Sequence, residues 1–277
     1  MKQTIRAALA VLLALALCAC SAAKAPKEPT AQELYQRVME QNKTLEKLNA
    51  HLEMQMQLEM EGGETSSEAS AEAPEGEEPL LLNVTGDVLG ENVGKPEMRM
   101  AMPMQMDMLG ITVETSTWFA DGYLLMDMVG TKVKAPIPLE KALEQFSAAD
   151  VQPLDYVSDL AMTKDETTGL YTVTYAMDME KAMELSASYM GGLIGEMDES
   201  QQFTWEHSNG SLVADAEGNL VSQQMDTAFS YELEGVPVHC TMQMDYVYNE
   251  IPADFAVEIP DAGEFVEVTA EQLGLAA

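Results

Sequence analysis

The sequence predicts an α+β fold, in which a curved antiparallel sheet shaped as a half-barrel carries helices packed on its concave face. Apolar residues recur at helical spacing over residues 30–48, and from residue 51 the spacing changes to alternation, as in a half-buried strand. Further alternating segments follow with short polar turns between them, which favours antiparallel pairing. Pro103 stands inside one such segment and lacks an amide donor, so we expect an edge or a bulge in a bent sheet.

The first residues predict a secreted, lipid-anchored protein. A basic start, MKQTIR, precedes an apolar run that is too short to be a spanning helix. The run ends in Leu17-Cys18-Ala19-Cys20, which resembles the bacterial lipobox. The resemblance implies cleavage before Cys20, diacylglycerol on its sulfur and usually acylation, such as with palmitate, of the new amino terminus. We therefore expect a signal peptide at 1–19, a flexible tether at 20–29 and a mature protein on the extracytoplasmic face of the cell membrane. An ordinary signal peptide cut near Ala23 is the alternative.

An amphipathic helix and a strand follow the tether. Thr30 with Glu33 three residues later forms a capping box, which satisfies free amides at a helix start. Leu34, Val38, Leu45 and Leu48 then fall on one helical face. The next segment, HLEMQMQLEM at 51–60, alternates Leu or Met with Glu or Gln and predicts a strand with one face in water.

The segment 61–79 interrupts this pattern. It is rich in Glu, Gly, Ser and Ala and has no basic residue. Such a composition buries too little apolar surface to offset ordering entropy, so we expect a disordered acidic loop. Calcium binding is the functional alternative, but the spacing of an EF-hand loop is missing.

The remaining chain continues the alternation of strands and helices. The strong hairpin signal Asp121-Gly122 separates two of the strands, and Pro138 opens a short helix. Residues 30–277 thus predict a single domain. Its further elements are strands at 80–88, 98–108, 111–119, 123–129, 156–162 and 170–177, helices at 138–146 and from about 178, and a final meander over 203–208, 211–219, 220–233 and 236–248.

At this point the pattern resembles a known family. The amphipathic helix leading into HLEMQMQLEM, the hairpin STWFADGYLLMDM and the late meander are similar to uncharacterised lipoproteins of Gram-positive envelopes. That family is similar in fold to the LolA/LprG class of carriers. The resemblance covers residues 30–265 and implies an open half-barrel, with helices that lid a hydrophobic cavity for acyl chains. The acidic loop and the excess of methionine depart from the carrier pattern.

Charge and motifs argue against nucleic-acid binding and catalysis. The formal net charge of −33 repels nucleic acid and anionic headgroups. His51, His207 and His239 lack metal-binding spacing, and no phosphate loop, dinucleotide fingerprint or nucleophile elbow appears. Strand parity places Cys240 on an apolar face and His239 on the other, so Cys240 is expected to be buried. We predict no enzyme, no catalytic residue, no cofactor and no metal site.

The 22 methionines are the most unusual feature of the composition. Met98 to Met108 occupy every second position, and Leu replaces Met at equivalent positions of 51–60, which is the behaviour of packing residues. Met is flexible and suits irregular apolar surfaces. The predicted cavity-lining residues are Met54, Met56, Met100, Met102, Met104, Met106, Met183, Met190, Met242 and Met244.

The predicted function is a lipid-anchored envelope protein that binds an acyl-chain or other hydrophobic ligand, as carrier, chaperone or sensor. Its partners are the membrane, through Cys20, and a lipid or hydrophobic small molecule. Two alternatives stay open at this point. One is a protein-interaction module with a solid core, and the other is a Cu(I)-binding envelope protein, because thioethers are soft ligands.

Overall fold

The computed structural model describes residues 28–60, 79–146, 151–178, 181, 204–233 and 235–273. The chain divides into two units, Met1–Thr30 and Ala31–Ala277. All the described helices and strands belong to the second unit. The expected lipidation site Cys20, the signal peptide, residues 61–78 of the acidic loop and most of the helix expected from about 178 lie outside the described residues.

Most of the described chain is β-strand, and the strands form one 12-stranded sheet. In chain order they are β1 (Lys47–Met60), β2 (Leu80–Glu91), β3 (Arg99–Met108), β4 (Ile111–Ala120), β5 (Tyr123–Met128), β6 (Thr131–Pro136), β7 (Val157–Lys164), β8 (Tyr171–Met177), β9 (Thr204–Ala214), β10 (Leu220–Leu233), β11 (Val236–Tyr248) and β12 (Val266–Glu267).

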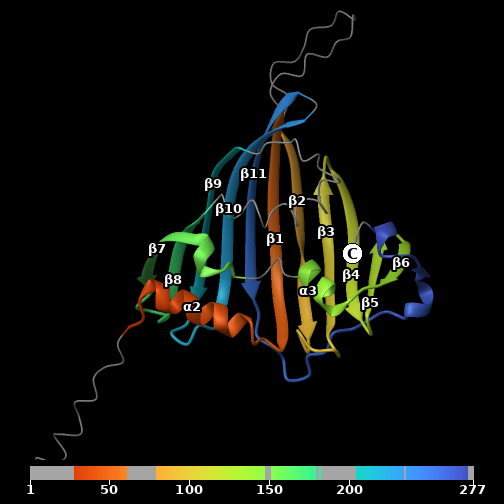
Figure 1. Ribbon diagram of the computed structural model, residues 1–277, viewed down its shortest axis with the longest axis horizontal. Helices are drawn as coiled ribbons and strands as arrows, with labels where there is room; N and C mark the ends of the chain where they lie inside the picture. Colours follow the sequence, from red (N-terminus) through yellow and green to blue (C-terminus); the bar gives the residue numbers. More distant parts are fainter. Residues whose placement is uncertain are drawn as a thin grey trace, which may run out of the picture. The chain divides into compact units, whose positions relative to one another are not determined.

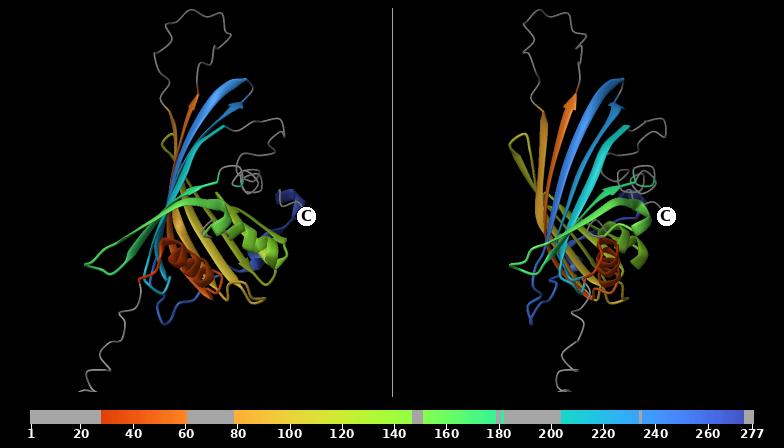
Figure 2. Two further views of the ribbon diagram at one scale, coloured as in Figure 1. Left: turned by 60° about the vertical axis from the view of Figure 1, so that its left-hand side comes forward. Right: turned by 90° about the vertical axis from the view of Figure 1, so that its left-hand side faces the viewer.

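The sheet is antiparallel, curved and not closed (Figures 1 and 2). Its order is β12-β6-β5-β4-β3-β2-β1-β11-β10-β9-β8-β7, so β12 and β7 are the edges and do not pair with each other. The short contact between β12 and β6 is the one parallel pairing among the described strands. β1 lies inside the sheet between β2 and β11, which brings an early strand beside a very late one.

Two α-helices pack on one face of this sheet. Helix α2 (Ala31–Asn42) buries Leu34 and Val38 in a cluster with residues of β8 and β9, and helix α3 (Leu139–Phe146) buries Ala142 in a cluster with residues of β1 to β5. The register connects the clusters, because cross-strand partners run from Leu52 through Tyr246, Gln223 and Leu212 to Val173. These residues therefore share one face, which we call the helix-bearing face. No helix in the described part of the chain is long and apolar enough to span a membrane.

Strand alternation holds as expected. The even-numbered residues of β1, β3 and β11 lie on the helix-bearing face, and the odd-numbered residues lie on the opposite face, which we call the polar face. Cys240 is accordingly buried, with 1% of its surface exposed, and burial raises the pKa of its thiol to about 11. A thiol with this pKa is protonated at neutral pH and is a poor nucleophile.

Three details differ from the sequence prediction. The first helix ends at Asn42 and not at 48, because the chain turns there and Leu48 already belongs to β1, where it pairs with Gly90. The strand β6 was not expected, since TKVKAP carries two lysines and a proline. The segments 203–208 and 211–219 do not form separate strands, since the single strand β9 extends from Thr204 to Ala214 and the chain turns after it.

The expectation for Pro103 is wrong. β3 is an interior strand that pairs with β2 and β4, and Pro103 itself pairs with Ser116 of β4. On the other side, the ladder between β2 and β3 is interrupted between the pairs Gly86–Met104 and Leu89–Ala101, at the position of Pro103. The missing amide hydrogen of proline accounts for this local gap, which the rest of the strand tolerates.

Candidate functional site

A row of methionines crosses the helix-bearing face from strand to strand. The register pairs Met225 of β10 with Met244 of β11, and Met244 with Met54 of β1. It continues from Met54 to Val84 of β2 and from Val84 to Met106 of β3. We call these residues the methionine row. Adjacent strands are about 4.8 Å apart, so its four strand spacings cover about 19 Å.

The methionines of this row lie at the margin of the packed core, and Met54 and Met244 pack against the cluster under α3. All four are half-buried. Met98 and Met100, which lie nearer α3 on the same face, are by contrast 0% and 1% exposed. The row therefore presents apolar, adaptable side chains that the packed clusters around the helices leave partly uncovered.

The other predicted methionines fall into four groups. Met56 and Met242 pair with each other beside the row and are half-buried. Met102 and Met104 are half-buried further along β3, where Met102 packs against the cluster under α3. Met100 belongs to that cluster itself. Met183 and Met190 lie outside the described residues.

The β9–β10 end of the row carries a buried polar pair that the sequence analysis missed. Tyr175 of β8 pairs with Gly210 of β9, which in turn pairs with Met225. The ring of Tyr175 fills the space that a Cβ on Gly210 would need. Gln223 precedes Met225 by two residues and shares its face. The alternation in LVSQQMDTAF could have predicted that Gln223 and Met225 share a face of their strand. No pattern in the neighbouring sequence, however, predicts that Gln223 lies beside Tyr175.

Burial dominates the chemistry of this pair. Tyr175 is 3% exposed and Gln223 is 1% exposed. Burial raises the pKa of Tyr175 to about 12, and a side-chain hydrogen bond with Gln223 opposes part of that rise. The hydroxyl of Tyr175 is therefore a neutral hydrogen-bond donor at physiological pH.

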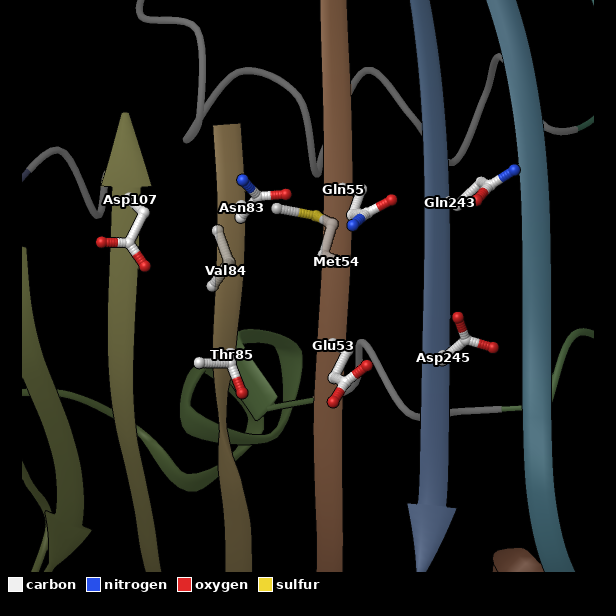
Figure 3. Close-up of a pocket in the computed structure, with 9 residues that line it drawn as sticks. All are labelled: Glu53, Met54, Gln55, Asn83, Val84, Thr85, Asp107, Gln243 and Asp245. Atoms are coloured by element: carbon white, nitrogen blue, oxygen red, sulfur yellow. The ribbon is translucent and has the colours of Figure 1, made fainter. Parts of the chain in front are cut away.

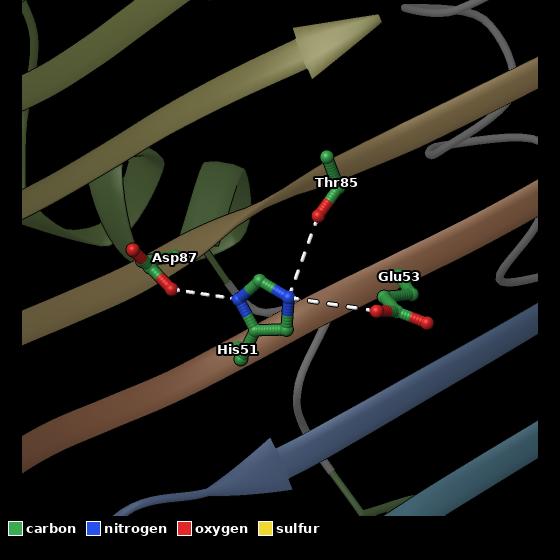
Figure 4. Close-up of polar contacts among 4 residues, drawn as sticks. All are labelled: His51, Glu53, Thr85 and Asp87. Atoms are coloured by element: carbon green, nitrogen blue, oxygen red, sulfur yellow. Dashed lines mark hydrogen bonds and ion pairs between the residues drawn. The ribbon is translucent and has the colours of Figure 1, made fainter.

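The polar face carries the three histidines, each beside a carboxylate. In Figure 4, Nδ1 of His51 lies 2.8 Å from Oδ1 of Asp87, and its Nε2 lies 3.4 Å from Oγ1 of Thr85 and 3.8 Å from Oε1 of Glu53. The other pairs are His207 Nε2 with Asp226 Oδ1 and His239 Nδ1 with Glu206 Oε1, both at 3.0 Å. His51 and Asp87 face each other directly across β1 and β2, as do Glu53 and Thr85. Ordinary cross-strand pairing produces this arrangement, so we assign it no catalytic role.

A shallow depression of about 350 Å³ also opens on the polar face. Figure 3 shows its lining side chains, which come from β1, β2, β3 and β11 and include Glu53, Asn83, Asp107 and Gln243. Carboxylates and amides are poor partners for an acyl chain. Within the described residues, no group of three or more His, Cys, Asp or Glu side chains could hold a metal ion.

Comparisons with known proteins give distant structural likenesses. No protein-family model matches the chain, and no curated protein matches it. Among solved structures the chain is similar to LprF from Mycobacterium bovis, with 14% identity over 84% of this chain and 99% of that one and a TM-score of 0.38. It is similar to the ywiB protein from Bacillus subtilis, with 12% identity over 76% and 99% of the two chains and a TM-score of 0.22. A DUF1329 family protein from Desulfovibrio piger has 9% identity over 82% and 95% of the two chains and a TM-score of 0.24.

At these identities and TM-scores, the likenesses do not carry a ligand or a role from those proteins to this chain.

Proposed function

We propose that this chain is a lipid-anchored protein of the cell envelope that binds an acyl-chain or similar hydrophobic ligand on its helix-bearing face. The observation that carries the proposal is the methionine row, in which half-buried thioether side chains from four strands lie in register. The ligand would lie between the row and the helices, with the helices on the concave side of the sheet. The role is that of a carrier, chaperone or sensor, without catalysis.

The chemistry of the row suits an acyl chain. Burying a methylene group stabilises a complex by about 0.8 kcal/mol, so a chain laid along the row gains affinity without directional contacts. Methionine has an unbranched, polarizable side chain that adjusts to chains of different length. We therefore expect broad selectivity for the hydrocarbon part of the ligand.

The amino-terminal region supports the location. The sequence up to Cys20 resembles a lipobox, and helix α2 begins at Ala31, which leaves 20–29 as a short tether between anchor and domain. The net charge of −33 disfavours attachment through anionic headgroups, so a covalent lipid is the attachment consistent with this charge.

The test uses two adjacent residues of β1 that lie on opposite faces. Met54→Glu puts a carboxylate into the methionine row, and Gln55→Glu puts the same charge on the exposed polar face. Binding of the uncharged fluorescent probe N-phenylnaphthylamine is measured for the parent protein and both variants.

We expect Met54→Glu to weaken probe binding by about tenfold or more, because a carboxylate in an apolar site costs several kcal/mol. Gln55→Glu should bind the probe as the parent does, and circular dichroism should show both variants folded. Equal binding by Met54→Glu and Gln55→Glu, or no binding by the parent protein, would exclude the proposed site. The latter result would favour an interaction module with a solid core.

A further inference from the structure

Most of the exposed large hydrophobic side chains in the described part of the chain lie at one end of the sheet. This is the end toward which β1, β3 and β5 run, and it carries the β3–β4 and β5–β6 turns (Figure 1). We call the following six residues the apolar rim: Leu81, Met108, Leu109, Ile111, Met128 and Val129. Leu109 and Val129 stand at the tips of the two turns, and each is 75% exposed. Apolar side chains that are exposed together, and not singly, mark an interaction site.

The backbone at the two tips is unfavourable for the residues that occupy it. Leu109 and Val129 both have a φ of 53°, in the left-handed region that glycine, asparagine and aspartate adopt most easily. At the opposite end of the sheet, the turn residues Asn92 and Asp121 have nearly the same φ, of 52° and 53°. The chain therefore uses the favourable residue types in those turns and large apolar residues at the tips of the rim. Stability does not explain this difference, so we attribute it to a function of the tips.

The strand register aligns the two tips along the edge of the curved sheet. Met108 of β3 pairs with Ile111 of β4, and Met128 of β5 pairs with Thr115, four residues further along β4. The ends of the strands are thus staggered from β3 to β5. Strands in a barrel-like sheet are tilted by about 35–45° from its axis, and this tilt turns a staggered set of strand ends into a level rim. A flat partner can therefore contact both tips at once.

The groups around the tips hold the turns in place and supply no positive charge. Oδ1 of Asp127 accepts a hydrogen bond from the amide of Gly130 at 2.9 Å, which fixes the β5–β6 turn. Asp107 accepts a hydrogen bond from the hydroxyl of Thr112 across the ends of β3 and β4. No lysine or arginine occurs in the sequence 100–131. An anionic headgroup at the rim would thus meet carboxylates and no cation from these two hairpins.

We propose that the apolar rim inserts into the surface of a lipid bilayer that carries little net charge. A specific protein interface buries about 800 Å² on each partner and needs a complementary shape, which two narrow turns and a strand end do not offer. A bilayer accepts apolar side chains in any arrangement, and the burial of each one is favourable. The lipid anchor expected at Cys20, with its tether at 20–29, would keep a bilayer close to the domain.

The rim adjoins the methionine row without being part of it. Met106, the last residue of the row, precedes Met108 by two residues and shares its face of β3. If the row binds an acyl chain, as proposed above, the inserted rim would place the β3 end of the row beside the bilayer. Membrane contact itself needs no ligand, so the two proposals can fail separately.

The test measures binding of the protein to lipid vesicles in the absence of its anchor. The protein begins at Ser21, so it lacks the lipidation site expected at Cys20 and keeps every described helix and strand. Co-sedimentation is measured with vesicles of dioleoylphosphatidylcholine and with vesicles of an equal mixture of this lipid and dioleoylphosphatidylglycerol. The variants are the double change Leu109→Asn with Val129→Asn and, as the control, Val247→Asn. Val247 is an exposed valine near the opposite end of the sheet, on β11.

We expect the parent protein to bind the phosphatidylcholine vesicles, and to bind the mixed vesicles more weakly. The double variant should bind the phosphatidylcholine vesicles at least about tenfold more weakly, because two large aliphatic side chains no longer enter the bilayer. Val247→Asn should bind as the parent does. Asparagine tolerates the φ of both tips, so urea unfolding should show that the double variant is at least as stable as the parent. This result separates a loss of binding from a loss of folding.

Five results would overturn the inference. The first three are a parent protein that binds neither kind of vesicle, a double variant that binds as the parent does, and a control variant that loses as much affinity as the double variant. The fourth is tighter binding to the mixed vesicles, which would point to a basic surface elsewhere. The fifth is a dimer of the parent protein, seen by sedimentation velocity without vesicles, that the double variant does not form. This last result would assign the rim to contact between two copies of the chain.

Binding of N-phenylnaphthylamine to the same proteins tests the proposed function separately. The double variant should bind this probe as the parent does, because the methionine row is unchanged. If the parent protein binds the probe but no vesicles, only the inference about the rim is wrong. If it binds vesicles but not the probe, only the proposed function fails.

Discussion

Replacing Gly210 by alanine should destabilise this protein, although the same change in an ordinary strand is stabilising. Glycine inside a strand costs about 0.5–1 kcal/mol relative to alanine because it loses more backbone entropy on folding. At Gly210, however, ring carbons and Oη of Tyr175 occupy the position of the new Cβ. The ring has little freedom to move away, since it is 3% exposed and meets the ring of Tyr35 edge-on at 5.3 Å between centroids.

The expected size of the effect follows from these opposing contributions. Overpacking a filled site costs about 1–3 kcal/mol, and the backbone gain returns about 0.5–1 kcal/mol. Gly210→Ala should therefore lower the free energy of unfolding by up to about 2.5 kcal/mol. When Tyr175 is first replaced by alanine, the obstacle is gone, and Gly210→Ala should raise the free energy of unfolding by about 0.5–1 kcal/mol.

The assay is urea unfolding at 25 °C, followed by circular dichroism, of the parent, the two single variants and the double variant. Tyr175→Ala alone should cost about 3–5 kcal/mol, so its effect is subtracted within the cycle. The change of sign between the two backgrounds is the diagnostic result. A Gly210→Ala variant that is more stable than the parent protein would show that the ring of Tyr175 does not lie over β9.

Three further predictions concern the anchor, the turns and copper. Cys20→Ala should abolish partitioning into the detergent phase, whereas Cys18→Ala should retain it; a Cys20→Ala protein that still partitions would refute the lipobox assignment. Leu109 lies in an exposed turn with a φ of 53°, a conformation that asparagine tolerates better than leucine. Leu109→Asn should therefore raise the free energy of unfolding, measured by urea titration, by up to about 1 kcal/mol. Asp121→Leu, the opposite kind of change at a residue with the same φ, should lower it. Joint replacement of Met54, Met106 and Met244 by leucine should leave probe binding nearly unchanged, because leucine for methionine costs under about 1.5 kcal/mol per site. If instead the parent protein binds Cu(I) with sub-nanomolar affinity and this variant does not, the copper alternative is established.

Local patterns in the sequence predicted much of the sheet and the faces of its strands. The alternation in HLEMQMQLEM and in the segment from Met98 to Met108 assigned each side chain to a face, because successive residues of a strand point to opposite sides. The hairpin at Asp121-Gly122 was predicted for a similar reason, since few residue pairs tolerate its backbone angles, here φ of 53° and 78°. Both signals depend on residues that are close together in the chain.

The ends of elements were predicted less well. The helical spacing of Leu34 and Val38 continues by chance to Leu45 and Leu48, but the helix ends at Asn42 and Leu48 enters β1. Strand β6 has a weak pattern of its own, and its pairing with β5 recruits it into the sheet. In each case a contact distant in sequence decides between two local conformations of similar energy.

Only the tertiary structure decided which side chains meet across the sheet. Alternation placed Met54, Met106 and Met244 on apolar faces, but their alignment in one row follows from the register of β1 with β2 and β11, and of β2 with β3. Likewise, Tyr175 and Gln223 come together because Gly210 lies between their strands and leaves room for the ring. The sequence by itself determined which face each residue occupies, since that is a property of the local backbone. The register and the order of the strands depend on which distant segments pair with each other. Packing over the whole sheet decides this pairing, so a local sequence pattern does not predict it.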